Sequence, residues 1–167
     1  DHLMISSTLN SSNYSFIDKK ASISSYILEN DSAKYVGESI NEKFHLSYPF
    51  IFKYLDDFYM LPESSANKDL RLYKANKFPF DWELERVIFN NVIACDGTIF
   101  QYGEKWWLFV NKDSSNSLEN NSELFAYFSN NPVTRLLGDN ALTSCEKSHE
   151  FLIGKIGLLL AKFQLLS

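Results

Sequence analysis

Short apolar and aromatic runs, separated by polar turn residues, follow one another along most of the chain. Runs of this kind, rich in aromatic and β-branched residues, are typical of antiparallel strands. The pattern predicts strands over residues 23–28, 34–40, 48–54, 57–61, 69–75, 82–88, 97–102, 105–110 and 122–129. Residues 1–20 are rich in Ser and Asn and weakly patterned, so we expect a frayed or incomplete edge there.

Part of this pattern occurs twice. A shift of 48 positions places residues 51–54 on 99–102 and residues 58–61 on 106–109 without a gap. Each copy has the form of a hairpin, and a period of about 40 to 50 residues with four short strands is typical of a β-propeller. A closed propeller needs about four blades or more, and 167 residues have room for fewer. We therefore predict an all-β fold, a partial β-propeller of about two to three blades.

The pattern changes towards the end of the chain. Residues 111–121 are a polar run, which we interpret as a loop at the rim of a blade. Thr143 and Glu146 have the spacing of a helix-capping box, and residues 151–166 have the apolar spacing of an amphipathic or buried helix. We predict a partial propeller domain over residues 1–133 and a divergent, helical tail over residues 134–167. The C-terminal helix is too short and too polar to be expected to span a membrane.

Charge and cysteine content limit the class of protein. The net charge is −5 and the sequence has no cluster of Lys or Arg, which argues against nucleic acid and anionic membranes as partners. The sequence has two cysteines, Cys95 and Cys145, which is fewer than a secreted domain of this size usually carries. We therefore expect buried thiols. No signal peptide is visible at the start. The compartment stays open, with the cytoplasm favoured.

The sequence contains no recognisable metal or phosphate motif. His2, His45 and His149 are scattered, and no Cys/His spacing matches a zinc site. A Gly-rich phosphate loop and a serine nucleophile motif are also missing from the sequence. We predict neither a metal nor a cofactor.

Two carboxylates are candidates for catalytic residues. In a propeller the inner strands line a central channel. Under the shift of 48 positions, Tyr48 and Asp96 are equivalent and stand where two inner strands begin, and Glu63 follows a neighbouring strand. Two carboxyl groups about 5 to 9.5 Å apart are what glycoside cleavage requires. The alternative is that Glu63 and Asp96 are ordinary solvent-facing turn residues.

Short polar and aromatic side chains near these carboxylates are candidates for substrate binding. His45 and Tyr48 stand at the entrance of one inner strand, Ser64 and Asn67 follow the candidate glutamate, and Trp106 offers a face on which a sugar ring can pack. The alternative for His45 is a structural histidine whose hydrogen bonds are satisfied within the fold.

Several motifs carry a family resemblance. They are Tyr-Pro-Phe at 48–50, Pro-Glu-Ser-Ser-Ala-Asn at 62–67 and Phe-Pro-x-x-Trp at 78–82, followed by the DGTIF and WWLF segments. Together they make residues 23–133 resemble the glycoside-hydrolase-family-43-like, five-bladed propeller domain at the N-terminus of plant glucosamine inositolphosphorylceramide transferases. A similar domain occurs in bacterial proteins, some of which join it to a formyltransferase-like region.

The resemblance implies a carbohydrate setting and a clan whose hydrolases use two aspartates and a glutamate. Glu63 matches the acid-like position and Asp96 one of the aspartate-like positions. The family's preceding strand, which would supply another aspartate, is not recognisable before Ile23, and the chain departs from the family after Val133. The resemblance therefore does not yield a full catalytic set.

These departures favour a binding function over hydrolysis. The favoured function is that of a domain that binds a glycan or sugar nucleotide as part of a glycosyl- or formyl-transfer protein. The alternative is a glycoside hydrolase that uses Glu63 and Asp96 as acid/base carboxylates. An incomplete propeller also predicts self-association, or a partner that completes the ring.

Overall fold

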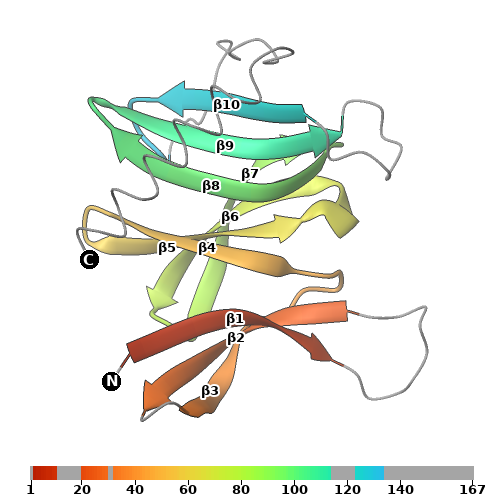
Figure 1. The fold of residues 1–167 in the computed structure, drawn as a ribbon, viewed down its shortest axis with the longest axis vertical. Helices are drawn as coiled ribbons and strands as arrows, with labels where there is room; N and C mark the ends of the chain where they lie inside the picture. Colours follow the sequence, from red (N-terminus) through yellow and green to blue (C-terminus); the bar gives the residue numbers. More distant parts are fainter. Residues whose placement is uncertain (1, 11–19, 30–31, 114–122, 134–167) are drawn as a thin grey trace.

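The computed structural model describes residues 2–10, 20–29, 32–113 and 123–133, and nearly all of them lie in β-strands (Figure 1). A single 3-10 turn, η1 (Ser65–Asn67), is described beside the strands. The strands are β1 (His2–Asn10), β2 (Lys20–Glu29), β3 (Ser32–Ile40), β4 (Ser47–Tyr54), β5 (Asp57–Ser64), β6 (Asp69–Lys77), β7 (Asp81–Asn90), β8 (Ile93–Tyr102), β9 (Lys105–Asp113) and β10 (Glu123–Ser129).

Three antiparallel sheets form successive layers (Figure 1). The N-terminal sheet has the order β1-β2-β3, the middle sheet β4-β5-β6-β7 and the C-terminal sheet β10-β9-β8. Strand β4 contacts both β1 and β8, and β8 also contacts β5, so the first strands of the three sheets lie next to one another. The fold is all-β and partly propeller-like, as the sequence predicts.

The predicted strands are confirmed, with corrections at their ends. Residues 2–10 are not a frayed edge, because β1 pairs with β2 along its whole length. Strand β5 does not stop at Leu61 but continues through Glu63 to Ser64. Strand β9 runs to Asp113, so residues 111–113 of the predicted loop at 111–121 are strand, and residues 114–121 lie outside the described residues. The predicted C-terminal helix lies outside the described residues.

The internal repeat extends to backbone geometry. Ser47 pairs with Glu63 and Phe50 with Leu61, so two residues of β4 face one residue of β5. The same arrangement recurs 48 positions later, where Cys95 pairs with Asn111 and the next pair lies beyond a bulge in β8. Tyr48 and Asp96 occupy the equivalent bulge positions, with φ of 46° and 54°. Both inner strands therefore carry the same β-bulge, a device that changes the direction of a side chain.

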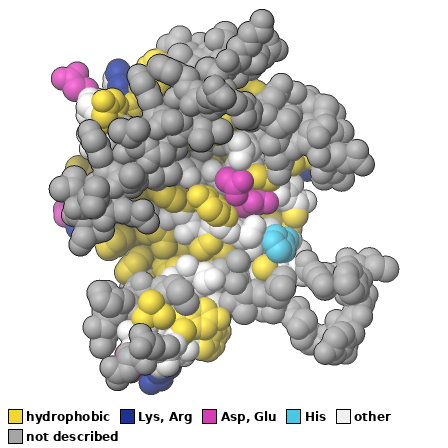
Figure 2. All heavy atoms as spheres, viewed as in Figure 1, with side chains coloured by type: hydrophobic (Ala, Val, Ile, Leu, Met, Phe, Trp, Pro, Cys, Tyr) yellow, Lys and Arg dark blue, Asp and Glu magenta, His cyan; other side chains and the backbone are white. Residues whose placement is uncertain are grey.

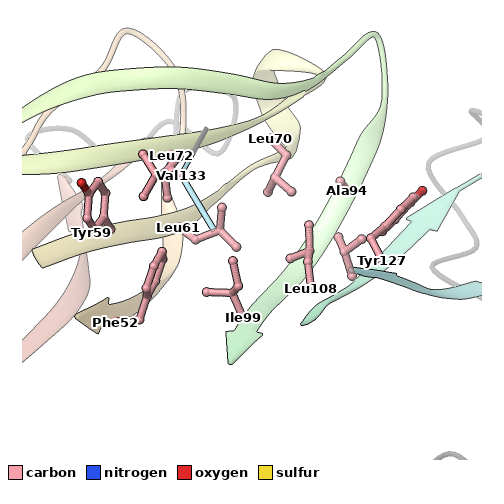
Figure 3. Packing of buried hydrophobic residues seen from close by; sticks show 11 residues of the cluster. Phe52, Tyr59, Leu61, Leu70, Leu72, Ala94, Ile99, Leu108, Tyr127 and Val133 are labelled. Carbon is pink, nitrogen blue, oxygen red and sulfur yellow. The ribbon is translucent and has the colours of Figure 1, made fainter. Parts of the chain in front are cut away.

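Two apolar cores join the three sheets. The larger one lies between the middle and C-terminal sheets and contains Leu61, Leu70, Ile99 and Leu108, all almost fully buried (Figure 3). The smaller one, around Ile23, Leu46 and Met60, lies between the N-terminal and middle sheets.

Gly97 sets how closely β8 approaches β5. A Cβ atom at Gly97 would stand 2.9 Å from Cδ2 of Leu61, closer than real Cβ contacts allow. The absence of a side chain there brings the residues next to it, including Asp96, close to the middle sheet.

Candidate functional site

Glu63 lies inside β5, on the face that meets the C-terminal sheet. It is two residues from the core residue Leu61, and side chains at such spacing share one face of a strand. Its Oε1 accepts a hydrogen bond of 2.8 Å from Oγ of Ser65 in η1. Pro62 precedes it and stands opposite the β4 bulge, where the ladder is irregular and a residue without an N–H is tolerated. Strand β5 therefore ends at Ser64, three residues later than the composition predicts, and the turn η1 begins at Ser65.

Asp96 projects from the β8 bulge and is exposed. Its Oδ2 accepts a hydrogen bond of 3.2 Å from the side-chain amide of Asn111, which is the repeat equivalent of Glu63. The hydroxyl of Tyr48, on the equivalent bulge of β4, lies 3.3 Å from Oγ1 of Thr98. The two bulges are thus linked across neighbouring inner strands.

The thiol of Cys95, the residue before Asp96, is buried. Burial raises the pKa of this thiol to about 11, and the nearby carboxylates of Glu63 and then Asp96 act in the same direction. A negative charge on sulfur is disfavoured beside other negative charges. Cys95 was expected to be a buried thiol, and it is; Cys145 lies outside the described residues.

We call this set of side chains the carboxylate patch: Tyr48, Glu63, Ser65, Asp96, Thr98 and Asn111. In Figure 2, Asp and Glu side chains lie beside one another on one face of the molecule, with a histidine nearby. Tyr48, Glu63 and Asp96 of this set are candidates from the sequence, and Ser65 stands in the polar segment that follows Glu63. Thr98 and Asn111 were not candidates, although the repeat alignment of Asn111 with Glu63 was a usable signal.

His45 and Trp106 are held by the fold. Nδ1 of His45 accepts a hydrogen bond of 3.2 Å from the backbone N–H of Ala21, which ties the entrance of β4 to β2. This hydrogen bond supports the interpretation of His45 as a structural histidine. Trp106 packs on Phe52 and Tyr54, with ring centroids 5.8 and 5.5 Å apart, and is only partly exposed.

Ser64 and Asn67 shape the turn that follows Glu63. Ser64 is fully buried, and its hydroxyl donates a hydrogen bond of 2.8 Å to the carbonyl of Asp69. Asn67 is exposed, and its amide donates to Oδ2 of Asp69 at 2.8 Å. Both side chains hold η1 in place, and Ser64 presents no surface to a ligand.

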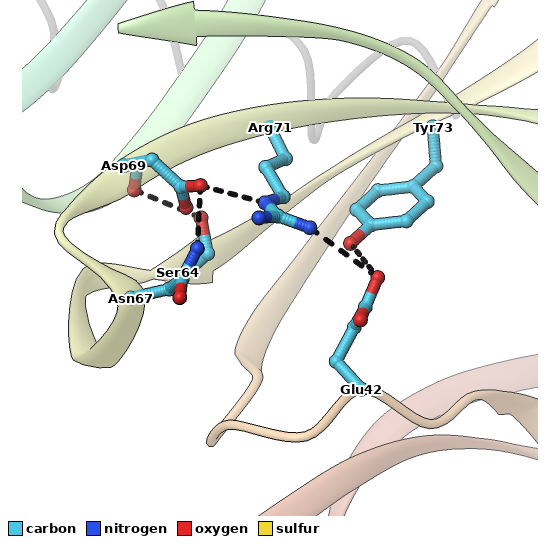
Figure 4. A network of polar contacts seen from close by, with 6 residues as sticks. All are labelled: Glu42, Ser64, Asn67, Asp69, Arg71 and Tyr73. Carbon is cyan, nitrogen blue, oxygen red and sulfur yellow. Dashed lines mark hydrogen bonds and ion pairs between the residues drawn. The ribbon is translucent and has the colours of Figure 1, made fainter. Parts of the chain in front are cut away.

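A second polar network lies on the opposite face of the middle sheet (Figure 4). The guanidinium of Arg71 donates from Nε to Asp69 at 2.7 Å and forms a longer ion pair of 3.5 Å with Glu42. Glu42 also accepts a bond of 2.8 Å from the hydroxyl of Tyr73. Burial, followed by this bond to a carboxylate, raises the pKa of Tyr73 well above its usual value. Arg71 lies 4.7 Å from the centre of the Phe44 ring, so it links the segment before β4 to the turn after β5.

The described residues contain neither a cluster of metal ligands nor a membrane-spanning helix. Within the described ranges, no three His, Cys, Asp or Glu side chains come together in a way that could hold a metal ion. No helix among them is long and apolar enough to cross a membrane.

Comparison with known proteins identifies the family. Residues 12–150 match the family described as "Glucosamine inositolphosphorylceramide transferase 1, N-terminal". The chain is 42% identical over 100 residues to glucosamine inositolphosphorylceramide transferase 1 from Oryza sativa subsp. japonica and from subsp. indica, with 60% of this chain and 13% of each relative covered. It is 35% identical over 98 residues to the protein of that name from Arabidopsis thaliana, covering 59% of this chain and 13% of the relative. The chain therefore spans a small part of the length of these relatives, and it belongs to the family of glucosamine inositolphosphorylceramide transferase 1 N-terminal domains.

Proposed function

We propose that this domain binds a glycan at the carboxylate patch and serves as a recognition domain in a glycosyl-transfer protein. The relatives are named glucosamine inositolphosphorylceramide transferase 1, and the sugar in that name supports a carbohydrate setting. The observation that carries the proposal is that Glu63 on β5 and Asp96 on the β8 bulge belong to two strands in contact, where Gly97 brings β8 close to Leu61. Carboxylates, hydroxyls and amides are the groups that read sugar hydroxyls.

The patch has donors and acceptors arranged for several hydroxyl groups. Ser65 and Asn111 each donate to one carboxylate oxygen, which leaves further acceptor positions on Glu63 and Asp96. Tyr48 is 44% exposed and offers an aromatic face beside them. His45, Ser64, Asn67 and Trp106 support the patch by holding its strands and turn, rather than by contacting the sugar.

A glycoside hydrolase is the second candidate function. It is favoured by the different surroundings of the two carboxylates, since Glu63 is half-buried beside a hydroxyl and Asp96 is exposed beside an amide. In such enzymes, different surroundings give two carboxyl groups different pKa values, so that one acts as the acid and the other as the base or nucleophile. The resemblance calls for a second aspartate, however, and no aspartate partners Glu63 and Asp96 in the described hydrogen bonds. We therefore place binding before hydrolysis.

Binding measurements on the full chain test this function. Isothermal titration with a set of oligosaccharides should detect a ligand, and Glu63→Gln and Asp96→Asn should each weaken its binding about tenfold without lowering the melting temperature. Glu104→Gln is a matched control, because Glu104 is exposed in the β8–β9 turn and outside the patch. Unchanged binding in both patch variants would refute the proposal. Release of sugar from nitrophenyl glycosides, lost in Glu63→Gln, would favour the hydrolase instead.

A further inference from the structure

One hairpin turn carries an exposed leucine in a backbone conformation that suits glycine. Leu55, between β4 and β5, has a φ of 55° and is 77% exposed. A left-handed φ is costly for a bulky residue, and such costs persist mostly at sites with a function. An apolar side chain is also unfavourable in water, so this turn is doubly costly at one residue.

The repeat indicates that the hairpin does not need this leucine in order to form. Gly103 stands 48 positions later, in the turn between β8 and β9, and has a φ of 60°. A Cβ atom added at Gly103 would meet no atom within 4 Å, so this turn projects into open space. The two hairpins thus share a turn conformation, but only one of them has the residue that this conformation favours.

The two turns lie side by side, on the same side of the view in Figure 1. The ring of Tyr54, the residue before Leu55, lies 5.5 Å from the ring of Trp106 at the start of β9. Tyr102, the repeat equivalent of Tyr54, ends β8 and is 63% exposed. This end of the molecule therefore exposes two large apolar side chains, one from each turn.

Each turn also has an acidic residue beside its apolar side chain. Asp56 follows Leu55, and its repeat equivalent, Glu104, follows Gly103; both carboxylates are exposed. Neither takes part in an ion pair within the part of the chain that the structure describes. We call Leu55, Asp56, Tyr102 and Glu104 the hairpin tips.

The lysines nearest to the hairpin tips have other contacts. Nζ of Lys105 donates a hydrogen bond to the side chain of Asn130. Nζ of Lys53 lies 5.8 Å from the centre of the Phe58 ring. The hairpin tips therefore combine exposed apolar surface with two carboxylates that no cation of this chain is described as pairing.

The hairpin tips are separate from the carboxylate patch. Strand β4 runs from Tyr48, in the patch, to the turn at Leu55. At the rise of a β-strand, these two residues are about 20 Å apart. A ligand of the patch and a partner of the hairpin tips would therefore occupy different ends of the inner strands.

We propose that the hairpin tips dock a protein segment whose apolar surface is flanked by Lys or Arg side chains. Leu55 and Tyr102 enter the apolar surface of that segment, and the two carboxylates pair with its basic rim. A second copy of this chain does not offer such a rim, since the net charge is −5 and the sequence has no cluster of Lys or Arg. Anionic membranes attract basic segments and repel carboxylates, so they do not fit the hairpin tips.

A synthetic amphipathic helix made of Leu and Lys has the chemistry of this partner, and the same helix with Glu in place of Lys is its control. Both are titrated into the full chain by fluorescence anisotropy. At low salt the Leu/Lys peptide should bind about four- to twentyfold more tightly than the Leu/Glu peptide, because two exposed ion pairs contribute about two- to fivefold each. High salt should reduce this difference.

Variants separate the hairpin tips from a general attraction of basic peptides to an acidic chain. Leu55→Gly should weaken binding of the Leu/Lys peptide about tenfold, because it removes a side chain that binding buries. It should not lower the melting temperature, because glycine suits the φ of this turn. Asp56→Asn should weaken binding about two- to fivefold. The control Leu84→Thr removes an exposed leucine from β7 and should leave binding unchanged.

Three results would overturn this inference. The first is that the Leu/Lys peptide does not bind, or binds Leu55→Gly as tightly as the wild-type chain. The second is binding to phosphatidylcholine vesicles that Leu55→Gly abolishes, because the turn would then be a membrane anchor. The third is a dimer in sedimentation experiments that Leu55→Gly dissociates, because a second copy would then occupy the hairpin tips.

Discussion

Tyr48 and Asp96 show how one backbone feature serves two different side chains. Both have left-handed φ values, a conformation that is costly for residues other than glycine and that clusters at functional sites. The repeat predicted that these positions are equivalent. It did not predict their backbone conformation, because the bulge follows from the pairing of two strands and leaves no pattern of apolar residues in either.

The backbone at Asp96 gives the first prediction at this scale. Asp96→Gly should keep or slightly raise the free energy of unfolding, since glycine adopts φ near 54° without strain, and should abolish glycan binding. Asp96→Ala should lower the free energy of unfolding by about 1 kcal/mol, because alanine has a Cβ atom but lacks the polar side chain that lets aspartate tolerate this conformation and accept the bond from Asn111. Urea unfolding and titration of the three proteins would check both expectations. Equal stability of the Gly and Ala variants would contradict the argument.

The sequence predicted the strand segments that are rich in apolar residues. It failed where a strand segment has the polar composition that is typical of loops. β1 was missed because its residues include Ser and Asn, which read as an irregular edge, yet it pairs with β2 over its full length. The end of β5 was missed because Pro62 and Glu63 read as a turn, whereas the bulge opposite them accommodates the proline. The turns of the patterned hairpins β4–β5 and β8–β9 were predicted to the residue, whereas β8 begins four residues earlier and β9 ends three residues later than predicted. Local composition thus explains the predictions that failed, whereas tertiary pairing of the strands determines the structure.

Close packing of β8 on β5 gives a prediction at the scale of elements. Gly97→Ala should lower the free energy of unfolding by about 1 to 3 kcal/mol, because the added methyl group would lie 2.9 Å from Cδ2 of Leu61. Combining it with Leu61→Val should cost less than the sum of the two single changes, since valine lacks that methyl group. Chemical denaturation of the single and double variants measures this coupling. Additive losses would mean that the strands move apart instead.

Arg71 gives a second prediction at this scale, because it joins two elements that precede and follow the patch strands. Asp69 is 5% exposed, and its Oδ1 has no hydrogen-bond partner in the described structure, so it relies on the bonds to its other oxygen. Arg71→Met keeps most of the side-chain volume but leaves a buried carboxylate without its cation, which should cost about 3 kcal/mol. The control Lys74→Met removes a cation paired at the surface with Asp57 and should cost much less than Arg71→Met. Similar losses in thermal or urea unfolding would show that the network contributes little.

At the scale of the whole molecule, residues of the core between the middle and C-terminal sheets have repeat equivalents on the C-terminal sheet. Phe52 and Leu61 belong to the core between the middle and C-terminal sheets. Their equivalents 48 positions later, Phe100 and Phe109, lie on the C-terminal sheet with stacked rings 5.6 Å apart. Trp107 packs on Phe109, and its indole N–H is buried without a hydrogen-bond partner in the described structure. This aromatic face has the composition of a surface on which another sheet packs.

The last prediction follows from this equivalence: the chain should self-associate through the aromatic face. Apolar faces that another sheet would cover favour association in water, and the loss of Phe100 and Phe109 from the face should remove much of that driving force. Phe100→Thr combined with Phe109→Thr keeps β propensity and should shift the chain towards monomer in sedimentation experiments. Leu84→Thr is the matched control, because Leu84 is 44% exposed on β7 and belongs to the middle sheet. A monodisperse wild-type monomer that unfolds cooperatively would show that this face needs no second copy, and an equal shift in the Leu84 control would place the contact elsewhere.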